Sequence, residues 1–310
     1  MKRADLISLV VLCALLVGVQ VTTHVLQRDY YLVQLTMAAY TAVVVMGLGL
    51  VMGYAGQVSL GHAAFFAVGG YTSAILTTTD VGHLALTPVG KALQRCGALV
   101  TQQRLFGQSQ IICVSPWLAF VAAVAITIAV AALIGYPALR LRGHYLAMAT
   151  LGFGLIVYRM VLGSDITGST DGISGVPAWT VFPGLTVSGR GENRIANYYV
   201  ASGFAVFTLV FILNVVGSRA GRALRAIHGS EKAANAMGVD TAVYKLKAFV
   251  ISAAFAGAAG SLMTHYSGGI GPSECGVMKS VRYVALVAAG GSANVWGGLI
   301  VGFTLTFLSL

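Results

Sequence analysis

The sequence has few charged residues: Asp, Glu, Lys and Arg together make up 9% of its 310 residues. A soluble domain of this length would carry about a quarter charged residues. Hydrophobic residues instead reach 57%, and the mean hydropathy is +0.84. The shortage of charge excludes a soluble globular domain and indicates several apolar helices of about 20 residues each, long enough to cross a bilayer.

Motifs of enzymes and cofactor sites are also missing. None of the 4 cysteines belongs to a CxxC pair, which argues against a metal or redox motif. The sequence has no G-x-x-x-x-G-K-[ST] stretch for binding ATP, and neither HExxH nor GxSxG occurs. We therefore predict that this chain has no catalytic residue, no metal site and no cofactor of its own.

Acidic residues are scarce, with only 9 Asp and Glu, and all lie in loops or near the ends of apolar segments. A proton relay usually needs carboxylates inside the membrane, so a proton-driven secondary transporter is disfavoured. A sodium-coupled transporter stays open as an alternative, because sodium can be bound by backbone carbonyls, which leave less of a signal in the sequence. The net charge of +10 is spread over short connections without interleaved aromatic residues, so nucleic acid is not an expected partner.

Apolar segments predict the positions of the membrane spans. They lie at about 6–26, 31–52, 60–79, 116–139, 144–162, 198–217, 248–266 and 281–310. The last is interrupted by GGSANVWGG at 290–298 and is expected to divide into a half-helix and a full helix. We therefore predict an all-α polytopic membrane protein, a single transmembrane domain over 1–310 with a bundle of about 8–10 transmembrane helices.

The distribution of basic residues predicts the orientation of the chain. The first apolar segment lacks a nearby small-residue cleavage site, so we interpret it as an uncleaved helix that starts in the cytoplasm. Alternating spans then place 53–59, 140–143 and the loop 218–247 inside, and 27–30, 80–115, 163–197 and 267–280 outside. This arrangement gives the inner segments the higher density of Lys and Arg. Cys96 and Cys113 share one outer loop, where a disulfide and two thiols are both open.

The inner segment RAGRALRAIHGSEKAANAMG, at 219–238, is unusually rich in charge for this chain. Arg222 and Arg225 are three residues apart and share a helix face. Ser230 is a good N-cap for a second short helix, Glu231 complements its positive end, and Gly238 can end it in a left-handed conformation. Two interpretations are open: a solvated basic loop near anionic lipid, or a short helix whose small apolar face, made by Ala233, Ala234 and Met237, docks on a partner.

The stretch SEKAANAMGVD resembles the E-x-A-A-x-x-x-G loop of ABC importer permeases, in which a short coupling helix docks on the ATPase subunit. The resemblance assigns coupling to the ATPase to these residues and their neighbours: Arg222, Arg225, Ser230, Glu231, Ala233, Ala234 and Gly238. Four other stretches, at 53–71, 139–154, 167–177 and 290–302, resemble in order the LivM-type permeases of branched-chain amino acid importers. The likeness covers most of the chain beyond residue 36.

This resemblance implies a bacterial inner-membrane permease in contact with lipid and with an N-terminus in the cytoplasm. Its implied partners are a second homologous permease, two cytoplasmic ATP-binding subunits that hold ATP and Mg, and a periplasmic or extracellular substrate-binding protein. The implied cargo is a branched-chain amino acid, moved by alternating access. Urea, amides or other amino acids stay open as cargo, and a self-sufficient secondary transporter or a membrane-embedded enzyme is the rival class.

The stretch GYAGQVSLGHAAFFAVGGY, at 53–71, holds the polar residues expected to face a path: Tyr54, Gln57, Ser59 and His62. Irregular backbone at membrane depth is tolerated only where protein or a watery cavity covers it. We therefore predict a broken or re-entrant element that lines the translocation path. The alternative is a cytoplasmic turn in which His62 is simply hydrogen-bonded between helices.

Three features depart from the LivM-type pattern. The loop 80–115 is longer than the family usually has, and Leu155 stands where the family often carries a glutamate. The sequence ends at TLTFLSL without a polar tail, so either the final helix is short-tailed or the sequence is truncated. The glycine-rich outer segment 167–177 either meets a binding protein or only connects two helices.

Overall fold

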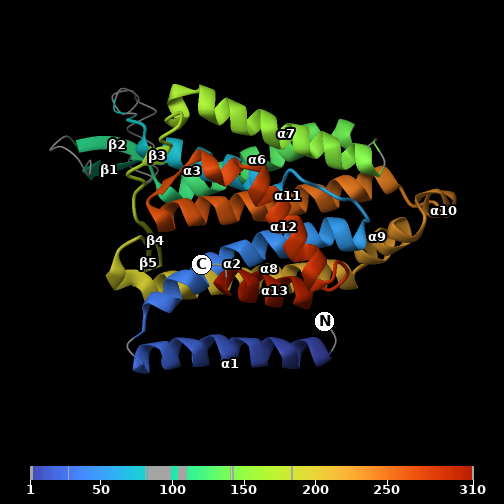
Figure 1. The fold of residues 1–310 in the computed structure, drawn as a ribbon, viewed down its shortest axis with the longest axis horizontal. Helices are drawn as coiled ribbons and strands as arrows, with labels where there is room; N and C mark the ends of the chain where they lie inside the picture. Colours follow the sequence, from blue (N-terminus) through green and yellow to red (C-terminus); the bar gives the residue numbers. More distant parts are fainter. Residues whose placement is uncertain are drawn as a thin grey trace.

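The computed structural model describes residues 3–26, 28–80, 82, 99–103, 110–139, 141, 143–182 and 184–308. In this part of the chain, long helices lie side by side and form one elongated bundle (Figure 1). The long helices are α1 (Arg3–Val25), α2 (Tyr30–Gly49) with a π-helical extension (Leu50–Tyr54), α6 (Pro116–Ala138), α7 (His144–Gly163), α8 (Arg194–Gly217) and α11 (Thr241–Ser267). The shorter ones are α3 (His62–Thr78), α9 (Arg219–Gly229), α10 (Glu231–Ala236), α12 (Val277–Gly290) and α13 (Val295–Leu308).

The bundle has the helices that a polytopic membrane protein requires. Among the described residues, 6 helical segments are long and apolar enough to cross a membrane. The shorter α3, α12 and α13 pack in the same bundle, and the predicted number of 8–10 transmembrane helices stays a prediction. The prediction of an all-α polytopic membrane protein is confirmed.

Two helix boundaries differ from the prediction. Helix α11 begins at Thr241, seven residues earlier than the predicted 248, because the Asp240 carboxylate accepts a hydrogen bond from the Val243 amide (3.2 Å) and caps it. The segment 281–310 divides as expected, into α12 and α13. Both of these helices have 14 residues, so the second is not the full-length helix that we predicted.

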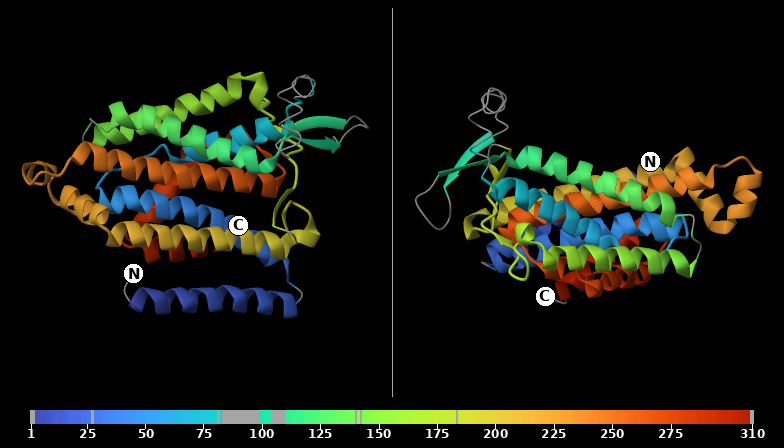
Figure 2. Two further views of the ribbon diagram at one scale, coloured as in Figure 1. Left: turned by 180° about the vertical axis from the view of Figure 1, so that it is seen from behind. Right: turned by 90° about the horizontal axis from the view of Figure 1, so that it is seen from above.

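The two ends of the bundle carry different structures (Figures 1 and 2). Helices α9 and α10 project from one end, which we call the α9–α10 end. The opposite end, called the strand end, carries three two-stranded antiparallel sheets within the described residues, which the sequence did not indicate. They pair β1 (Leu99–Gln103) with β2 (Gln110–Val114), β3 (Ile173–Ser174) with β6 (Gly269–Ile270), and β4 (Trp179–Phe182) with β5 (Leu185–Val187).

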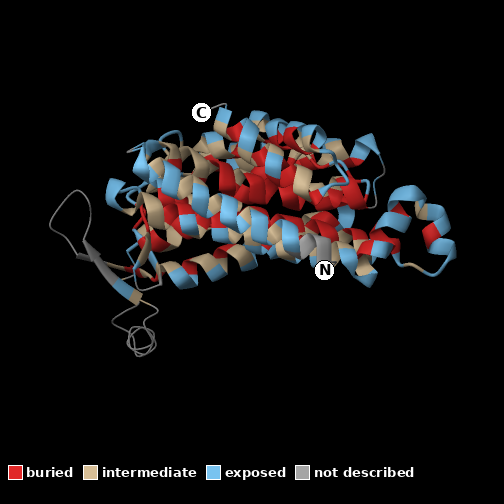
Figure 3. Ribbon diagram, turned by 90° about the horizontal axis from the view of Figure 1, so that it is seen from below, coloured by how far each residue is buried: buried red, intermediate tan, exposed pale blue. Residues whose placement is uncertain are grey.

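The centre of the bundle is the contact between α3 and α11, where glycines allow the two backbones to touch. A Cβ atom on Gly69 would lie 2.1 Å from the carbonyl oxygen of Gly257, and one on Gly260 would lie 1.9 Å from that of Phe66. Small residues of this kind are typical of helix interfaces in membranes. Figure 3 shows the buried residues concentrated in this bundle, whereas the projecting α9–α10 hairpin is largely exposed.

The glycine-rich segment 167–177 is fastened to the end of α11. Ile173 of β3 pairs with Ile270 of β6. His265 of α11 is fully buried. Its Nδ1 lies 2.8 Å from the carbonyl oxygen of Pro177, and its Nε2 lies 3.0 Å from the Ser73 hydroxyl of α3. The segment is therefore a tight connector, one of its two predicted roles, while contact with a binding protein stays a prediction.

Two predictions concern the segments 80–115 and 267–280. Cys96 and much of the first segment lie outside the described residues, so a disulfide with Cys113 and two thiols both stay open. The segment 267–280 is not an outer loop throughout, contrary to the prediction. Its last residues enter the bundle, because the Ser280 hydroxyl accepts a hydrogen bond from the Ala63 amide (3.3 Å) at the start of α3.

Candidate functional site

Helix α9 is amphipathic, as its sequence predicts. Ser218 caps its first turn by accepting a hydrogen bond from the Ala220 amide (3.1 Å). The face turned toward the bundle buries Gly221, Ala223, Leu224 and Ile227. Arg219, Arg222 and Arg225 are exposed on the other face. The helix therefore offers a basic surface beside the bundle rather than a second apolar one.

Helix α10 is short and has the predicted cap at each end. The Ser230 hydroxyl accepts from the Ala233 amide (3.3 Å), and Gly238 adopts the left-handed conformation with φ +82°. The predicted small apolar face is wrong in one respect, because its three residues do not point the same way. Ala234 is buried against the bundle, whereas Ala233 is exposed and Met237 is 85% exposed. Ala233 and the C-cap residue Met237, four residues apart, are therefore exposed together with Lys232, Asn235 and Ala236.

An ion pair fixes α10 to the long helix α11. A carboxylate oxygen of Glu231 lies 2.7 Å from Nζ of Lys245, whose side chain is only 6% exposed. The Thr241 hydroxyl also donates to Glu231 (3.5 Å). The sequence predicts Glu231 at the positive helix end and, by resemblance, among the coupling residues, but it does not predict this pair. The available signal was Lys245 itself, a basic residue at the start of an apolar helix, which needs a counter-ion when it is buried.

The stretch 55–61 is irregular backbone that enters the bundle from the α9–α10 end. It leaves the π-helical turn at Tyr54 and ends at His62, whose Nε2 lies 2.7 Å from the Ser252 hydroxyl of α11. Ser252 lies 11 residues after Thr241, the start of α11, or about 16 Å along the helix axis. The predicted break in the helical structure is therefore observed at depth in the bundle.

Three of the four predicted path residues make internal hydrogen bonds. The Tyr54 hydroxyl donates to the Ala293 carbonyl (2.8 Å). The Ser59 hydroxyl lies 3.1 Å from Nδ1 of His62, and both residues are only 1% exposed. His62 thus matches the alternative interpretation, a histidine hydrogen-bonded between helices. A role for these residues in translocation stays a prediction.

Gln57 is placed differently from the other three. Its side chain is buried, at 4% exposure, and neither the oxygen nor the nitrogen of the side-chain amide has a hydrogen-bond partner among the described residues. It borders a cavity of about 280 Å³ beneath α9 and α10, where His228, Glu231 and Lys245 are also found. The irregular stretch and the projecting hairpin therefore share one polar cavity.

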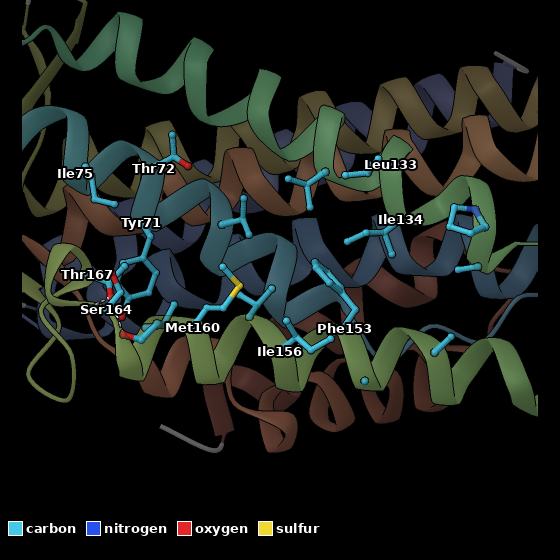
Figure 4. Close-up of a pocket in the computed structure, with 18 of the residues that line it drawn as sticks. Tyr71, Thr72, Ile75, Leu133, Ile134, Phe153, Ile156, Met160, Ser164 and Thr167 are labelled. Carbon is cyan, nitrogen blue, oxygen red and sulfur yellow. Dashed lines mark hydrogen bonds between the residues drawn. The ribbon is translucent and has the colours of Figure 1, made fainter.

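A larger groove of about 1010 Å³ runs between α3, α6 and α7 (Figure 4). Its walls are apolar except for a few hydroxyls such as those of Tyr71, Ser164 and Thr167, which Figure 4 shows together at one end. No charged side chain lines it in the described part of the chain. Leu133 and Met160 on its rim are 76% and 67% exposed, so the groove opens sideways, where a bilayer would surround the bundle. Its chemistry suits hydrocarbon rather than an ionic ligand.

Comparisons with known proteins agree with this architecture. Residues 30–310 match the family described as the permease component of the branched-chain amino acid transport system. The chain is 30% identical over 285 residues to the high-affinity branched-chain amino acid transport system permease protein LivM of Escherichia coli strain K12, covering 84% of this chain and 59% of that protein. It is 31% identical over 279 residues to the LivM protein of Salmonella typhimurium strain LT2, covering 84% and 58%.

The chain thus spans less than two thirds of the length of the curated relatives that it matches. No solved structure matches the chain.

Proposed function

Because the chain belongs to the family of branched-chain amino acid transport permeases, we propose that it is the membrane-spanning permease subunit of an ATP-binding-cassette importer. The proposed cargo is leucine, isoleucine or valine, moved by alternating access without chemistry on the cargo. ATP and Mg²⁺ are held by partner subunits in this proposal, and a second related permease completes the path.

The observation that carries the proposal is the projecting α9–α10 hairpin. A short capped helix that presents Ala233 and Met237 outward, beside the exposed arginines of α9, has the shape and chemistry to dock in a groove on a partner. A solvated loop would need neither the two caps nor the buried ion pair beneath α10. A transporter that works alone would have no use for such a docking helix.

The contacts of the hairpin would transmit a movement of the ATPase subunits to the helices of the bundle. The Glu231–Lys245 pair fixes α10 to α11, and α11 contacts α3 backbone to backbone through glycines. Packed helices move as rigid bodies because their interiors are as dense as organic crystals. Closure of the ATPases would therefore displace α10, α11 and α3 together.

A second contact links the hairpin to the irregular stretch 55–61. A Cβ atom on Gly56 would lie 3.0 Å from Nδ1 of His228 in α9, so the two segments are in close contact. The Leu60 amide donates to the Thr150 hydroxyl of α7 (3.0 Å), which holds the other end of the stretch. A shift of α9 would change the position of this stretch relative to α7 and so open or close the path.

The distribution of charge supports an orientation with the α9–α10 end in the cytoplasm of a bacterial cell and the chain in its inner membrane. Among the residues whose exposure is described, five exposed arginines and lysines lie at this end: Arg219, Arg222, Arg225, Lys232 and Lys247. Helix α1 also begins at this end (Figure 1), which would place the N-terminus inside. The strand end would then face the substrate-binding protein.

Reconstitution in proteoliposomes tests the proposal. The purified chain, its second permease, two ATPase subunits and the binding protein should together take up radiolabelled leucine only with ATP inside. Omitting the ATPases is the control and should abolish uptake. Uptake by this chain alone would instead support a self-sufficient transporter, and competition by urea, amides or other amino acids would redefine the cargo.

A further inference from the structure

The polar cavity beneath α9 and α10 opens at the α9–α10 end of the bundle. It has a volume of about 280 Å³, and its lining comes from the irregular stretch 55–61 and from α7, α9, α10 and α11. His144 and His228 on its rim are exposed. Gln57 and Ile227, in the buried part of the lining, are both 4% exposed. The cavity is therefore open to a small solute at this end and closed toward the interior of the bundle.

Gln57 brings two unused hydrogen-bonding atoms to this cavity. Neither Oε1 nor Nε2 of its side-chain amide has a partner among the described residues. A buried amide without partners is costly, so a group of this kind points to a polar molecule bound beside it. That molecule must donate a hydrogen bond to Oε1 and accept another from Nε2.

The charges of the cavity favour a molecule without net charge. The one carboxylate and the one ammonium in its described lining, those of Glu231 and Lys245, lie 2.7 Å apart and neutralise each other. A free anion or cation would add an uncompensated charge, which is costly in a partly buried site. An amino acid carries an ammonium beside a carboxylate and has no net charge. Its ammonium can donate to Oε1 of Gln57 while its carboxylate accepts from Nε2.

The size and the apolar wall of the cavity suit a small aliphatic amino acid. Water occupies about 30 Å³ per molecule in the liquid, so the cavity has room for about nine waters, or for one amino acid with as many heavy atoms as leucine. Beside Gln57, aliphatic carbon is supplied by Val58, Leu146, Ala147 and Ile227. The cavity thus combines an amide for a main chain with an apolar wall for a side chain.

We propose that this cavity is a regulatory site, at which a branched-chain amino acid that has reached the cytoplasm binds back to the permease. Gln57 holds the ammonium and the carboxylate of the amino acid, and the aliphatic wall contacts its side chain. This inference rests on the proposed function, because import raises the concentration of amino acid at this end. It assigns Gln57 to inhibition of transport rather than to passage of the cargo.

The position of the cavity explains how a bound amino acid slows transport. Its walls belong to the elements whose relative movement the proposed function requires: the stretch 55–61, α7 and the α9–α10 hairpin. A ligand that contacts all of them in the described arrangement stabilises this arrangement against others. Transport therefore slows as the amino acid accumulates. By reciprocity, the state produced by closure of the ATPases binds the amino acid more weakly.

Uptake against a range of internal leucine concentrations tests this site. The complete importer is reconstituted with ATP inside, and the initial uptake of radiolabelled external leucine is measured. We expect internal leucine to lower this rate, and Gln57→Leu to raise the half-inhibitory concentration about tenfold, the effect of losing a hydrogen bond to a charged group. Each variant is compared with its own rate without internal leucine, so a change in basal transport does not affect the result.

A matched variant controls for the loss of a buried polar group. Gln57→Leu replaces an unpartnered amide by an apolar side chain, a change that does not threaten folding. Ser261→Ala likewise removes a buried polar group without a partner among the described residues. Ser261 lies 16 residues, or about 24 Å, farther along α11 than Lys245. This variant should be inhibited by internal leucine like the wild type.

Hydrogen exchange locates the bound amino acid independently of any variant. Leucine is added to the complex of the permeases and ATPases without the binding protein, and should slow amide exchange in 55–61 and 225–231. Isocaproate, which lacks the ammonium, and isoamylamine, which lacks the carboxylate, are the ligand controls. Neither should protect these segments, because each satisfies only one of the two atoms of the Gln57 amide.

The outcomes separate this inference from the proposed function. If the wild-type importer takes up leucine, but internal leucine neither slows uptake nor protects 55–61, the regulatory site is wrong and the function stands. If Gln57→Leu is inhibited as strongly as Ser261→Ala, or if isocaproate protects as leucine does, the regulatory site is also wrong. If the complete wild-type importer shows no ATP-dependent leucine uptake, both proposals are wrong.

Discussion

Glu231→Gln tests whether the buried ion pair holds α10 against the bundle. The substitution keeps the size of the side chain and removes its charge, so the ammonium of Lys245, with 6% of its side chain exposed, loses the carboxylate at 2.7 Å. Removing one partner of a buried pair costs about 3–5 kcal/mol. Because the Glu231 side chain is 27% exposed, and water can therefore reach the site, we expect the lower value, about 3 kcal/mol.

The loss of this ion pair weakens the docking of α10 on α11 rather than the folding of the whole bundle. A change of about 3 kcal/mol corresponds to a factor of roughly 100 in the ratio of docked to undocked hairpin. An isolated helix as short as α10, with 6 residues, is unstable, so undocking also unfolds it. Amide hydrogen exchange of 231–238 should therefore accelerate about a hundredfold, while exchange in α3 stays unchanged. ATP-dependent uptake should fall in parallel.

The double variant Glu231→Gln/Lys245→Met is the control. It removes both charges and leaves an apolar side chain of similar length, a replacement that is often neutral for a buried pair. Exchange of 231–238 should return close to the wild-type rate. Wild-type exchange in the single variant, or equally fast exchange in the single and double variants, would show that the ion pair does not hold α10 against the bundle.

Two further predictions concern single positions. Gly238→Val should destabilise the end of α10 by about 1–2 kcal/mol and lower uptake, because φ at this position is +82°. Gly238→Asn should retain most of the uptake, since Asn tolerates the left-handed conformation. Equal uptake by the two variants would contradict this prediction. Ser252→Ala leaves Nε2 of His62 without the hydroxyl at 2.7 Å and should cost about 1–3 kcal/mol of stability, measured by thermal unfolding in detergent. Ser261→Ala is the control, because that buried hydroxyl has no hydrogen-bond partner among the described residues, and an equal loss in both variants would count against the His62 contact.

Local signals in the sequence predicted much of the fold. The helix caps at Ser230 and Gly238 and the break before His62 depend on residues close in the chain, and all three are observed. Apolar runs likewise located the long helices within a few residues. Such features follow from the chemistry of neighbouring residues, which a sequence displays directly.

Contacts between distant segments were not predictable in the same way. The pairing of Glu231 with Lys245 and the approach of Lys279 to Phe66 depend on how helices pack. The exposure of Met237 opposite the buried Ala234 depends on the orientation of α10 over α11. The short strands were missed because strands of 2–5 residues give too little alternation to be recognised.

Cysteine trapping along α10 tests the central claim, that this hairpin docks on an ATPase. Single cysteines at Ala233, Ala234 and Met237 are introduced into a background without the native cysteines, and native membranes are treated with a crosslinker. We expect the exposed positions 233 and 237 to trap an ATPase subunit, with yields that change when ATP is added, and the buried position 234 to trap none. Failure of every position to trap a partner, in membranes that take up leucine, would contradict it.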